Sequence, residues 1–120
     1  MKNNIIIGTA NFNLKYRLRN NNKLNKAKIN EILKYCYTNN INVFDTAMDY
    51  DESESIIGKF IHKNNIKNFK IITKFKLTNS QSLQSDYLDS YKKLKIKPWC
   101  VLLHDVKKYV DNNYRKELFN

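Results

Sequence analysis

The feature that most constrains this chain is a set of four short apolar runs, each followed by glycine or a polar residue. They are residues 5–7 before Gly8, 41–44 before Asp45, 69–73 before Lys74 and 100–103 before His104. Each run is rich in β-branched or aromatic residues, which is typical of buried parallel strands. The sequence therefore predicts four such strands.

The segments between these runs have the period of amphipathic helices. In the first, Ile29, Ile32, Leu33 and Cys36 form one apolar stripe, which ends before two asparagines at 39–40. Asparagine adopts the left-handed turn that ends helices more readily than most residues. We therefore expect the helix to stop there.

Two further helices are expected, and the beginning of another. Ser53 is placed to cap the second helix, whose apolar face comprises Ile56, Ile57, Phe60 and Ile61. The third is expected from about Ser80, with Leu83, Tyr87, Leu88, Tyr91 and Leu94 on one side and Pro98 separating it from the last strand. Residues 112–118 have the pattern of the start of a fourth helix.

This alternation predicts an α/β fold with a parallel sheet and right-handed crossovers. The polar residues that end the runs are about 30 to 37 residues apart, which is enough for a strand, a loop and a crossover helix. A length of 120 residues is that of one domain. The pattern alone does not separate an open sheet from half of a barrel.

Four residues suggest acid–base chemistry at one edge of this sheet. Asp45, Lys74 and His104 end three successive strands, and Tyr50 follows Asp45 closely. Parallel α/β folds place active sites at this edge. A lysine held by an aspartate stabilises tyrosinate, so the tyrosine can donate a proton to a developing alkoxide while the histidine hydrogen-bonds the same oxygen. Taken singly, each residue has an ordinary structural explanation.

The sequence resembles the aldo-keto reductases. That family has a Phe-Asp-Thr-Ala element followed by Tyr-Gly-x-Ser-Glu, and this chain has Phe-Asp-Thr-Ala at 44–47 and Tyr-Asp-Glu-Ser-Glu at 50–54. Further similar stretches are residues 8–12, 71–74 and 102–105, in the family's order and spacing. The resemblance covers essentially the whole chain.

The resemblance implies the first four β/α units of a TIM (β/α)8 barrel, so residues 1–120 are expected to form a single, truncated aldo-keto reductase domain. It implies that Tyr50 is the general acid, that Lys74 and Asp45 support it, and that His104 orients a small carbonyl substrate. Hydride would come from NADPH, with NADH as the alternative. The family's cofactor contacts come chiefly from loops after later strands, so no cofactor-binding residue is assigned. The chain alone is expected to be inactive and to bind NADPH weakly.

Three positions depart from the family's glycines. Asp51 follows the catalytic-type tyrosine, Asn40 precedes the second strand, and Asn13 follows the first. Aspartate and asparagine tolerate positive φ better than most residues. We therefore expect the turns at Asp51 and Asn40 to persist.

The net charge of +11 indicates a basic surface. Its lysines are scattered along the chain, as codon bias in an AT-rich genome would produce, which gives little support to nucleic-acid binding. Cys36 and Cys100 show no metal-ligand spacing and are expected to be buried thiols in a reducing compartment, with no bound metal. No apolar stretch approaches the roughly 18–20 residues of a membrane span, so a cytoplasmic protein is expected. His62 is expected at the surface, and Trp99 packed at the foot of the last strand.

Four β/α units would leave two open sheet edges. This predicts self-association. It also provides an alternative to catalysis, in which the chain is a non-enzymatic remnant or interaction module that works by half-barrel association.

Overall fold

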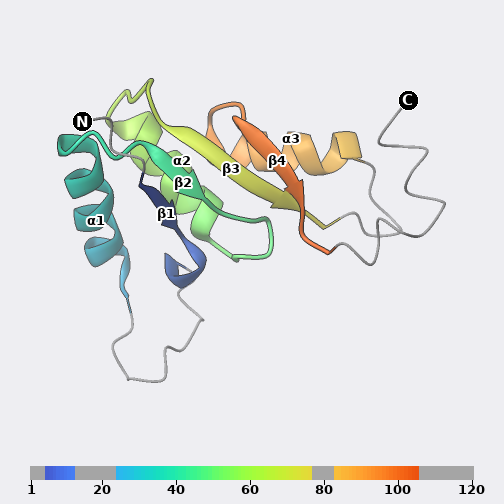
Figure 1. Cartoon of the computed structure of the whole chain (residues 1–120), viewed down its shortest axis with the longest axis horizontal. Helices are drawn as coiled ribbons and strands as arrows, with labels where there is room; N and C mark the ends of the chain where they lie inside the picture. The colour runs from blue at the N-terminus through green and yellow to red at the C-terminus, as the bar shows by residue number, and fades with distance from the viewer. Residues whose placement is uncertain (1–4, 13–23, 77–82, 106–120) are drawn as a thin grey trace.

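The computed structural model describes residues 5–12, 24–76 and 83–105 (Figure 1). Within them, one parallel sheet has the strand order β1-β2-β3-β4. Its strands are β1 (Ile6–Gly8), β2 (Val43–Asp45), β3 (Lys70–Phe75) and β4 (Cys100–Leu103). The remaining elements are a 3-10 helix η1 (Ala10–Phe12) and the helices α1 (Lys26–Thr38), α2 (Ser53–Lys63) and α3 (Leu83–Leu94). The predicted parallel α/β fold is confirmed.

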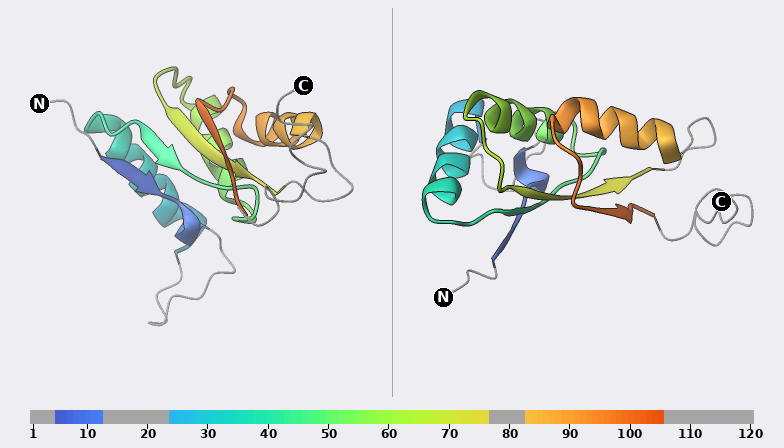
Figure 2. Two further views of the ribbon diagram at one scale, coloured as in Figure 1. Left: turned by 45° about the vertical axis from the view of Figure 1, so that its right-hand side comes forward. Right: turned by 90° about the horizontal axis from the view of Figure 1, so that it is seen from above.

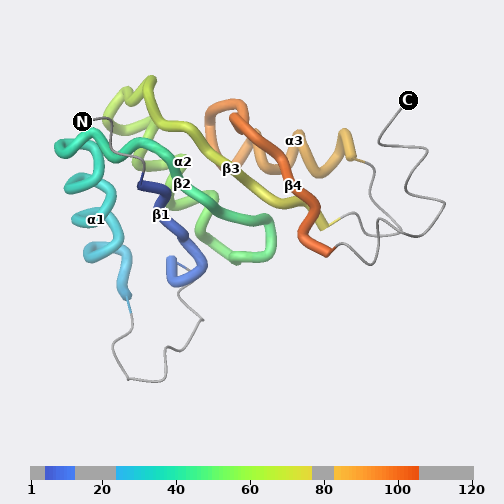
Figure 3. Tube along the Cα trace, viewed as in Figure 1, coloured from blue at the N-terminus to red at the C-terminus, as the bar shows by residue number. Residues whose placement is uncertain are grey.

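The three α-helices lie on one side of the sheet (Figure 2). Consecutive strands lie side by side along the tube trace, so each crossover returns the chain next to the strand that it left (Figure 3). The core fills the layer between helices and sheet, where Ile29, Leu33, Phe44, Ile57 and Ile71 are fully buried. The other face of the sheet is covered by no helix of the described residues.

Helix α1 follows its predicted pattern. The Asn25 side chain accepts a hydrogen bond from the Lys28 backbone N–H at 2.8 Å and caps the first turn. Ile29, Leu33 and Cys36 are buried. The helix ends at Asn39, and Asn40 has a φ of 58°. The expectation that Asn40 would take the left-handed turn is confirmed.

The expected capping role of Ser53 is wrong. Glu52 occupies the N-cap position of α2 without a side-chain capping bond, and Ser53 is the first residue of the helix. Its hydroxyl is buried and bonds to Thr9 and Thr46 instead. A buried hydroxyl needs hydrogen-bond partners, so the Ser53 side chain lies against these two threonines. The predicted apolar face of α2 is confirmed, since all four of its residues are buried.

The apolar side expected for α3 is partly wrong. Leu88 and Tyr91 are 45% and 42% exposed, whereas Asp86, Ser90 and Leu94 are buried. Ser90 turns inward because its hydroxyl donates to Oε1 of the buried Glu54 at 2.8 Å. The helix therefore packs through a polar contact that hydrophobic periodicity does not detect.

Glu54 connects three elements beneath the sheet. Its Oε1 also accepts a bond from Thr73 Oγ1 at 2.7 Å, so α2 is joined to both β3 and α3. Ser90, Thr73 and Glu54 are all at most 1% exposed. These two buried hydrogen bonds join the helix layer to β3.

The expectation that Trp99 packs at the foot of β4 is wrong. It is 60% exposed, and the Lys70 ammonium lies 5.1 Å from the centre of its ring. A cation over an indole face is a favourable arrangement at a surface. His62 is exposed, as expected.

Some expectations lie outside the described residues, namely Asn13, the start of the third helix near Ser80 and the fourth helix at 112–118. Among the residues that are described, no helix is long and apolar enough to span a membrane.

Close packing of α2 on α3 depends on Gly58. A Cβ at this position would lie 2.7 Å from the carbonyl carbon of Leu94 and 2.8 Å from its Cα. Backbone atoms cannot move aside as a flexible side chain can, so Gly58→Ala should push the two helices apart. We expect a loss of about 1–3 kcal/mol in the free energy of unfolding, measured by urea denaturation. The matched control is Lys59→Ala, at the exposed next position, which should change it by less than about 0.5 kcal/mol.

Candidate active site

The loop after β2 is held to β3 by backbone hydrogen bonds. Thr46 N donates to Ile72 O at 2.8 Å, and Met48 N donates to Lys74 O at 3.1 Å. The chain then turns, with Tyr50 N donating to Ala47 O at 3.0 Å. This backbone fixes Tyr50 just beyond the C-terminal ends of β2 and β3.

Asp51 completes the turn with a φ of 48°. This is the left-handed region that favours glycine, and an aspartate enters it at lower cost than most residues. The expectation that the turn persists without the family's glycine is confirmed.

A buried hydroxyl network ties the same loop to β1. Ser53 Oγ lies 2.9 Å from Thr9 Oγ1 and 3.1 Å from Thr46 Oγ1. Thr9 Oγ1 also donates to the backbone carbonyl of Asp45 at 3.0 Å. The three side chains are fully buried, so a buried network joins the residues after β1 and β2 to the first residue of α2.

Lys74 and Asp45 form an ion pair at the ends of β3 and β2. The same ammonium donates to the Thr46 carbonyl at 3.0 Å. The Lys74 side chain is only 18% exposed, and a largely buried cation needs such acceptors. Asp45 thus fixes the lysine, as expected from the sequence.

Tyr50 lies against this pair, and His104 lies against Tyr50. The Lys74 ammonium is 5.4 Å from the centre of the Tyr50 ring. The Tyr50 and His104 rings meet edge to face, with centroids 6.0 Å apart and an interplanar angle of 84°. His104 N donates to Phe75 O at 3.0 Å, which continues the pairing of β4 with β3. The structure therefore brings all four predicted residues to one edge, while their catalytic roles remain a prediction.

Asp49 is a member of this cluster that the sequence reasoning missed. One of its carboxylate oxygens pairs with Lys76, and the other lies 3.5 Å from Nδ1 of His104. The sequence carried one weak signal. Lys76 lies two residues beyond Lys74, and side chains two apart on a strand project to the same face.

Metal ligation has no support among the described residues, which contain no group of three histidine, cysteine or acidic side chains suited to an ion. Cys36 and Cys100 are both free thiols. Cys36 is buried as expected, and burial raises the pKa of its thiol. Such a cysteine is a poor nucleophile. Cys100 is only partly buried.

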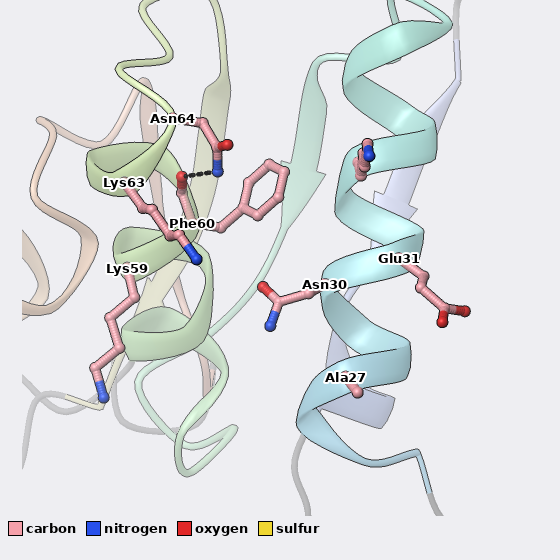
Figure 4. A pocket seen from close by; sticks show the side chains of 8 residues that line it. Ala27, Asn30, Glu31, Lys59, Phe60, Lys63 and Asn64 are labelled. Carbon is pink, nitrogen blue, oxygen red and sulfur yellow. Dashed lines mark hydrogen bonds between the residues drawn. The ribbon is translucent and has the colours of Figure 1, made fainter.

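A groove of about 390 Å³ lies elsewhere, between α1 and α2 (Figure 4). Its polar groups are mostly exposed lysines and asparagines of the two helices, and Asn64 Nδ2 is bonded to the Phe60 carbonyl at 2.8 Å. It lacks the converging acid–base groups of the strand ends. The lining residues are Ala27, Asn30, Glu31, Lys34, Lys59, Phe60, Lys63 and Asn64.

Comparison with known structures supports the fold. Two solved structures described as aldo-keto reductases, both from Pseudomonas aeruginosa, match with TM-scores of 0.71 and 0.69 at 19% sequence identity. Each match covers 94% of this chain, but only 48% and 47% of the respective solved chain. The chain thus spans about half the length of these structures, and its sheet is half of a (β/α)8 barrel.

Comparison of sequences gives the family. No curated protein matches the chain. The model of the aldo/keto reductase family, however, matches residues 4–118. That range includes both the Phe-Asp-Thr-Ala element and the strand ends where Lys74 and His104 lie. The chain therefore belongs to the aldo/keto reductase family.

Proposed function

We propose that this chain supplies the proton-transfer site of an oxidoreductase that reduces a small aldehyde or ketone with NAD(P)H, or oxidises the corresponding alcohol. The observation that carries the proposal is the placement of Tyr50 between the Lys74–Asp45 ion pair and His104 at the C-terminal edge of the sheet. Membership of a family of oxidoreductases supports it.

In this proposal Tyr50 is the general acid. As the carbonyl oxygen gains negative charge, the Tyr50 hydroxyl transfers its proton to that oxygen, and solvent later restores the proton. The adjacent Lys74 ammonium stabilises the tyrosinate that remains. Asp45 keeps the ammonium in place, and His104 donates a hydrogen bond to the reacting oxygen when the ring nitrogen that faces this oxygen carries a proton.

The cofactor supplies the hydride for the carbonyl carbon when it is bound, with NADP(H) favoured and NAD(H) the alternative. The described residues suit the carbonyl end of the reaction better than the phosphates of a dinucleotide. Lys74 and Lys76 at this edge each pair with an aspartate, and Lys26 at the start of α1 pairs with Glu52 at 3.3 Å. We infer that the phosphate contacts come from residues outside the described part of this half-barrel.

The two free cysteines suit a reducing compartment. We therefore propose a cytoplasmic location, with a small carbonyl compound as the partner of the site and neither nucleic acid nor a membrane.

Tyr50→Phe tests the acid, because it removes the proton and keeps the ring. The assay uses a chimaeric barrel, in which this chain replaces the matching half of the Pseudomonas aeruginosa structure. We expect kcat for aldehyde reduction to fall roughly 10²–10⁴-fold. Tyr35→Phe, on the exposed side of α1, is the matched control and should leave kcat unchanged. An unchanged kcat in Tyr50→Phe would refute the assignment.

The chain by itself should bind NADPH weakly and turn over no aldehyde, because positioning of the two reactants accounts for much of such a rate. Its charge of +11 should also give nonspecific binding that weakens as salt is added. Fluorescence titration with NADPH at low and high salt measures both effects. Micromolar binding that resists salt, together with aldehyde turnover, would show a complete site in the half-barrel.

Half-barrel association is a second candidate function, and a specific observation favours it. β1 and β4 each have a neighbouring strand on one side only among the described residues. Ile6 on β1 and Leu102 on β4 are 56% and 45% exposed. Unpaired strand edges beside exposed apolar side chains favour pairing with another chain.

If this association occurs, two copies can pair β4 of each with β1 of the other, because the strands are parallel and neither edge strand has a second neighbouring strand among the described residues. Analytical ultracentrifugation should then show a concentration-dependent dimer. Leu102→Lys should weaken it, whereas Leu88→Lys on the exposed side of α3 should not. A monomer at all concentrations would exclude this function.

A further inference from the structure

Asp49 is tied to two strand ends through separate oxygens. Its Oδ1 pairs with Lys76, just beyond β3, and its Oδ2 lies 3.5 Å from Nδ1 of His104, just beyond β4. The backbone on either side is fixed, since Met48 N is bonded to Lys74 O and Tyr50 N to Ala47 O. The carboxylate is therefore held from its own loop and from both neighbouring strands.

We propose that Asp49 is a positioning residue that sets the ring orientation and the neutral tautomer of His104. Its catalytic meaning rests on the proposed function, because His104 matters to turnover only if it contacts the reacting oxygen. The contact itself belongs to this chain's own residues and requires no cofactor.

The tautomer follows from the chemistry of the two groups. An ionised carboxylate only accepts hydrogen bonds, and a neutral imidazole carries one N–H. With Asp49 facing Nδ1, the proton is favoured on Nδ1, and Nε2 retains its lone pair. A neutral His104 then presents a hydrogen-bond acceptor to whatever binds beside Tyr50.

This acceptor selects between the two substrates of the proposed reaction. In its neutral Nδ1–H tautomer, His104 can accept a hydrogen bond at Nε2 from the hydroxyl of an alcohol, but it has no proton on Nε2 to donate to a carbonyl oxygen. Only the protonated ring donates from both nitrogens. Asp49 therefore matches the neutral site to the alcohol and the protonated site to the aldehyde or ketone.

Lys76 keeps the carboxylate in place for this purpose. It occupies Oδ1, which leaves Oδ2 as the oxygen that faces the imidazole. Among the described residues, His104 faces Asp49 and the Tyr50 ring, both from the β2–α2 loop. Because the Asp49 pairs are partly exposed, the expected effect is moderate.

The tautomer can be read directly from the imidazole ¹⁵N shifts of the full chain at about pH 8.5, where an ordinary imidazole is neutral. The chain has two histidines, so exposed His62 is an internal reference. We expect Asp49→Asn to lower the ratio of the Nδ1–H to the Nε2–H tautomer of His104 roughly two- to fivefold. His62 should not change.

Asp89→Asn is the matched control, because Asp89 also has an exposed lysine partner, Lys92, but lies on α3. It should leave both histidines unchanged. Asp49→Glu should retain part of the Nδ1–H preference, and Lys76→Gln should lose part of it. If the His104 tautomer ratio is the same in Asp49→Asn as in the parent chain, Asp49 does not position His104.

The test of Asp49 as a positioning residue and the test of the proposed function can give different results. A tautomer that depends on Asp49, together with a Tyr50→Phe chimaera of unchanged kcat, would uphold the positioning and reject the acid role of Tyr50. An unchanged His104 tautomer ratio in Asp49→Asn, together with a reduced kcat in the Tyr50→Phe chimaera, would reject only the positioning role of Asp49.

Discussion

The ion pair of Lys74 with Asp45 is the interaction on which the strand-end cluster depends. The Lys74 side chain is mostly withdrawn from water, so it requires acceptors, and it finds them in the Asp45 carboxylate and the Thr46 carbonyl. Both acceptors belong to β2 or the residue after it. The pair therefore determines how the loop that carries Tyr50 approaches β3, and the tyrosine ring lies beside the ammonium as a consequence.

The opposite face of β3 supports this arrangement. Side chains alternate along a strand, so Thr73 points to the helix layer while Lys74 points to the other face. Thr73 is bonded to the buried Glu54, which also holds Ser90 of α3. Displacing β3 would break the Thr73–Glu54 hydrogen bond and the ion pair together, and a buried hydroxyl left without its partner is costly. The strand end is thus fixed from both faces.

Much of this could be predicted from the sequence, because strands and parallel order follow from apolar runs and their spacing. Asp45, Lys74 and His104 were found for the same reason, since they end those runs. Asn40 and Asp51 could be placed in left-handed turns from their side-chain chemistry alone. These predictions rest on local pattern, which a single sequence contains.

The features that were missed depend on tertiary contacts. Ser53 has the right residue type for a helix cap, but the hydroxyls of Thr9 and Thr46 give it better partners. Ser90 is buried through Glu54, which is 36 residues away, and Leu88 is exposed as a result of how α3 packs. Hydrophobic periodicity counts apolar residues and cannot detect a polar group that is buried because it forms a hydrogen bond with another buried group. For the same reason the sequence did not indicate Asp49, whose partners Lys76 and His104 lie just beyond two other strands.

The described residues at the strand ends include candidate proton-transfer groups but few unpaired cations for an anionic cofactor. Tyr50, Lys74 and His104 lie at or just beyond the C-terminal ends of β2, β3 and β4, and the two lysines of that edge, Lys74 and Lys76, each pair with an aspartate. An anionic dinucleotide therefore gains little from this edge beyond the chain's diffuse charge, which salt screens. Under the proposed function, the described residues of this edge offer more for proton transfer than for binding a cofactor, and a second surface against the open face of the sheet would supply the cofactor contacts. Exposed apolar side chains of the sheet, such as Ile6 and Leu102, would favour association with such a surface.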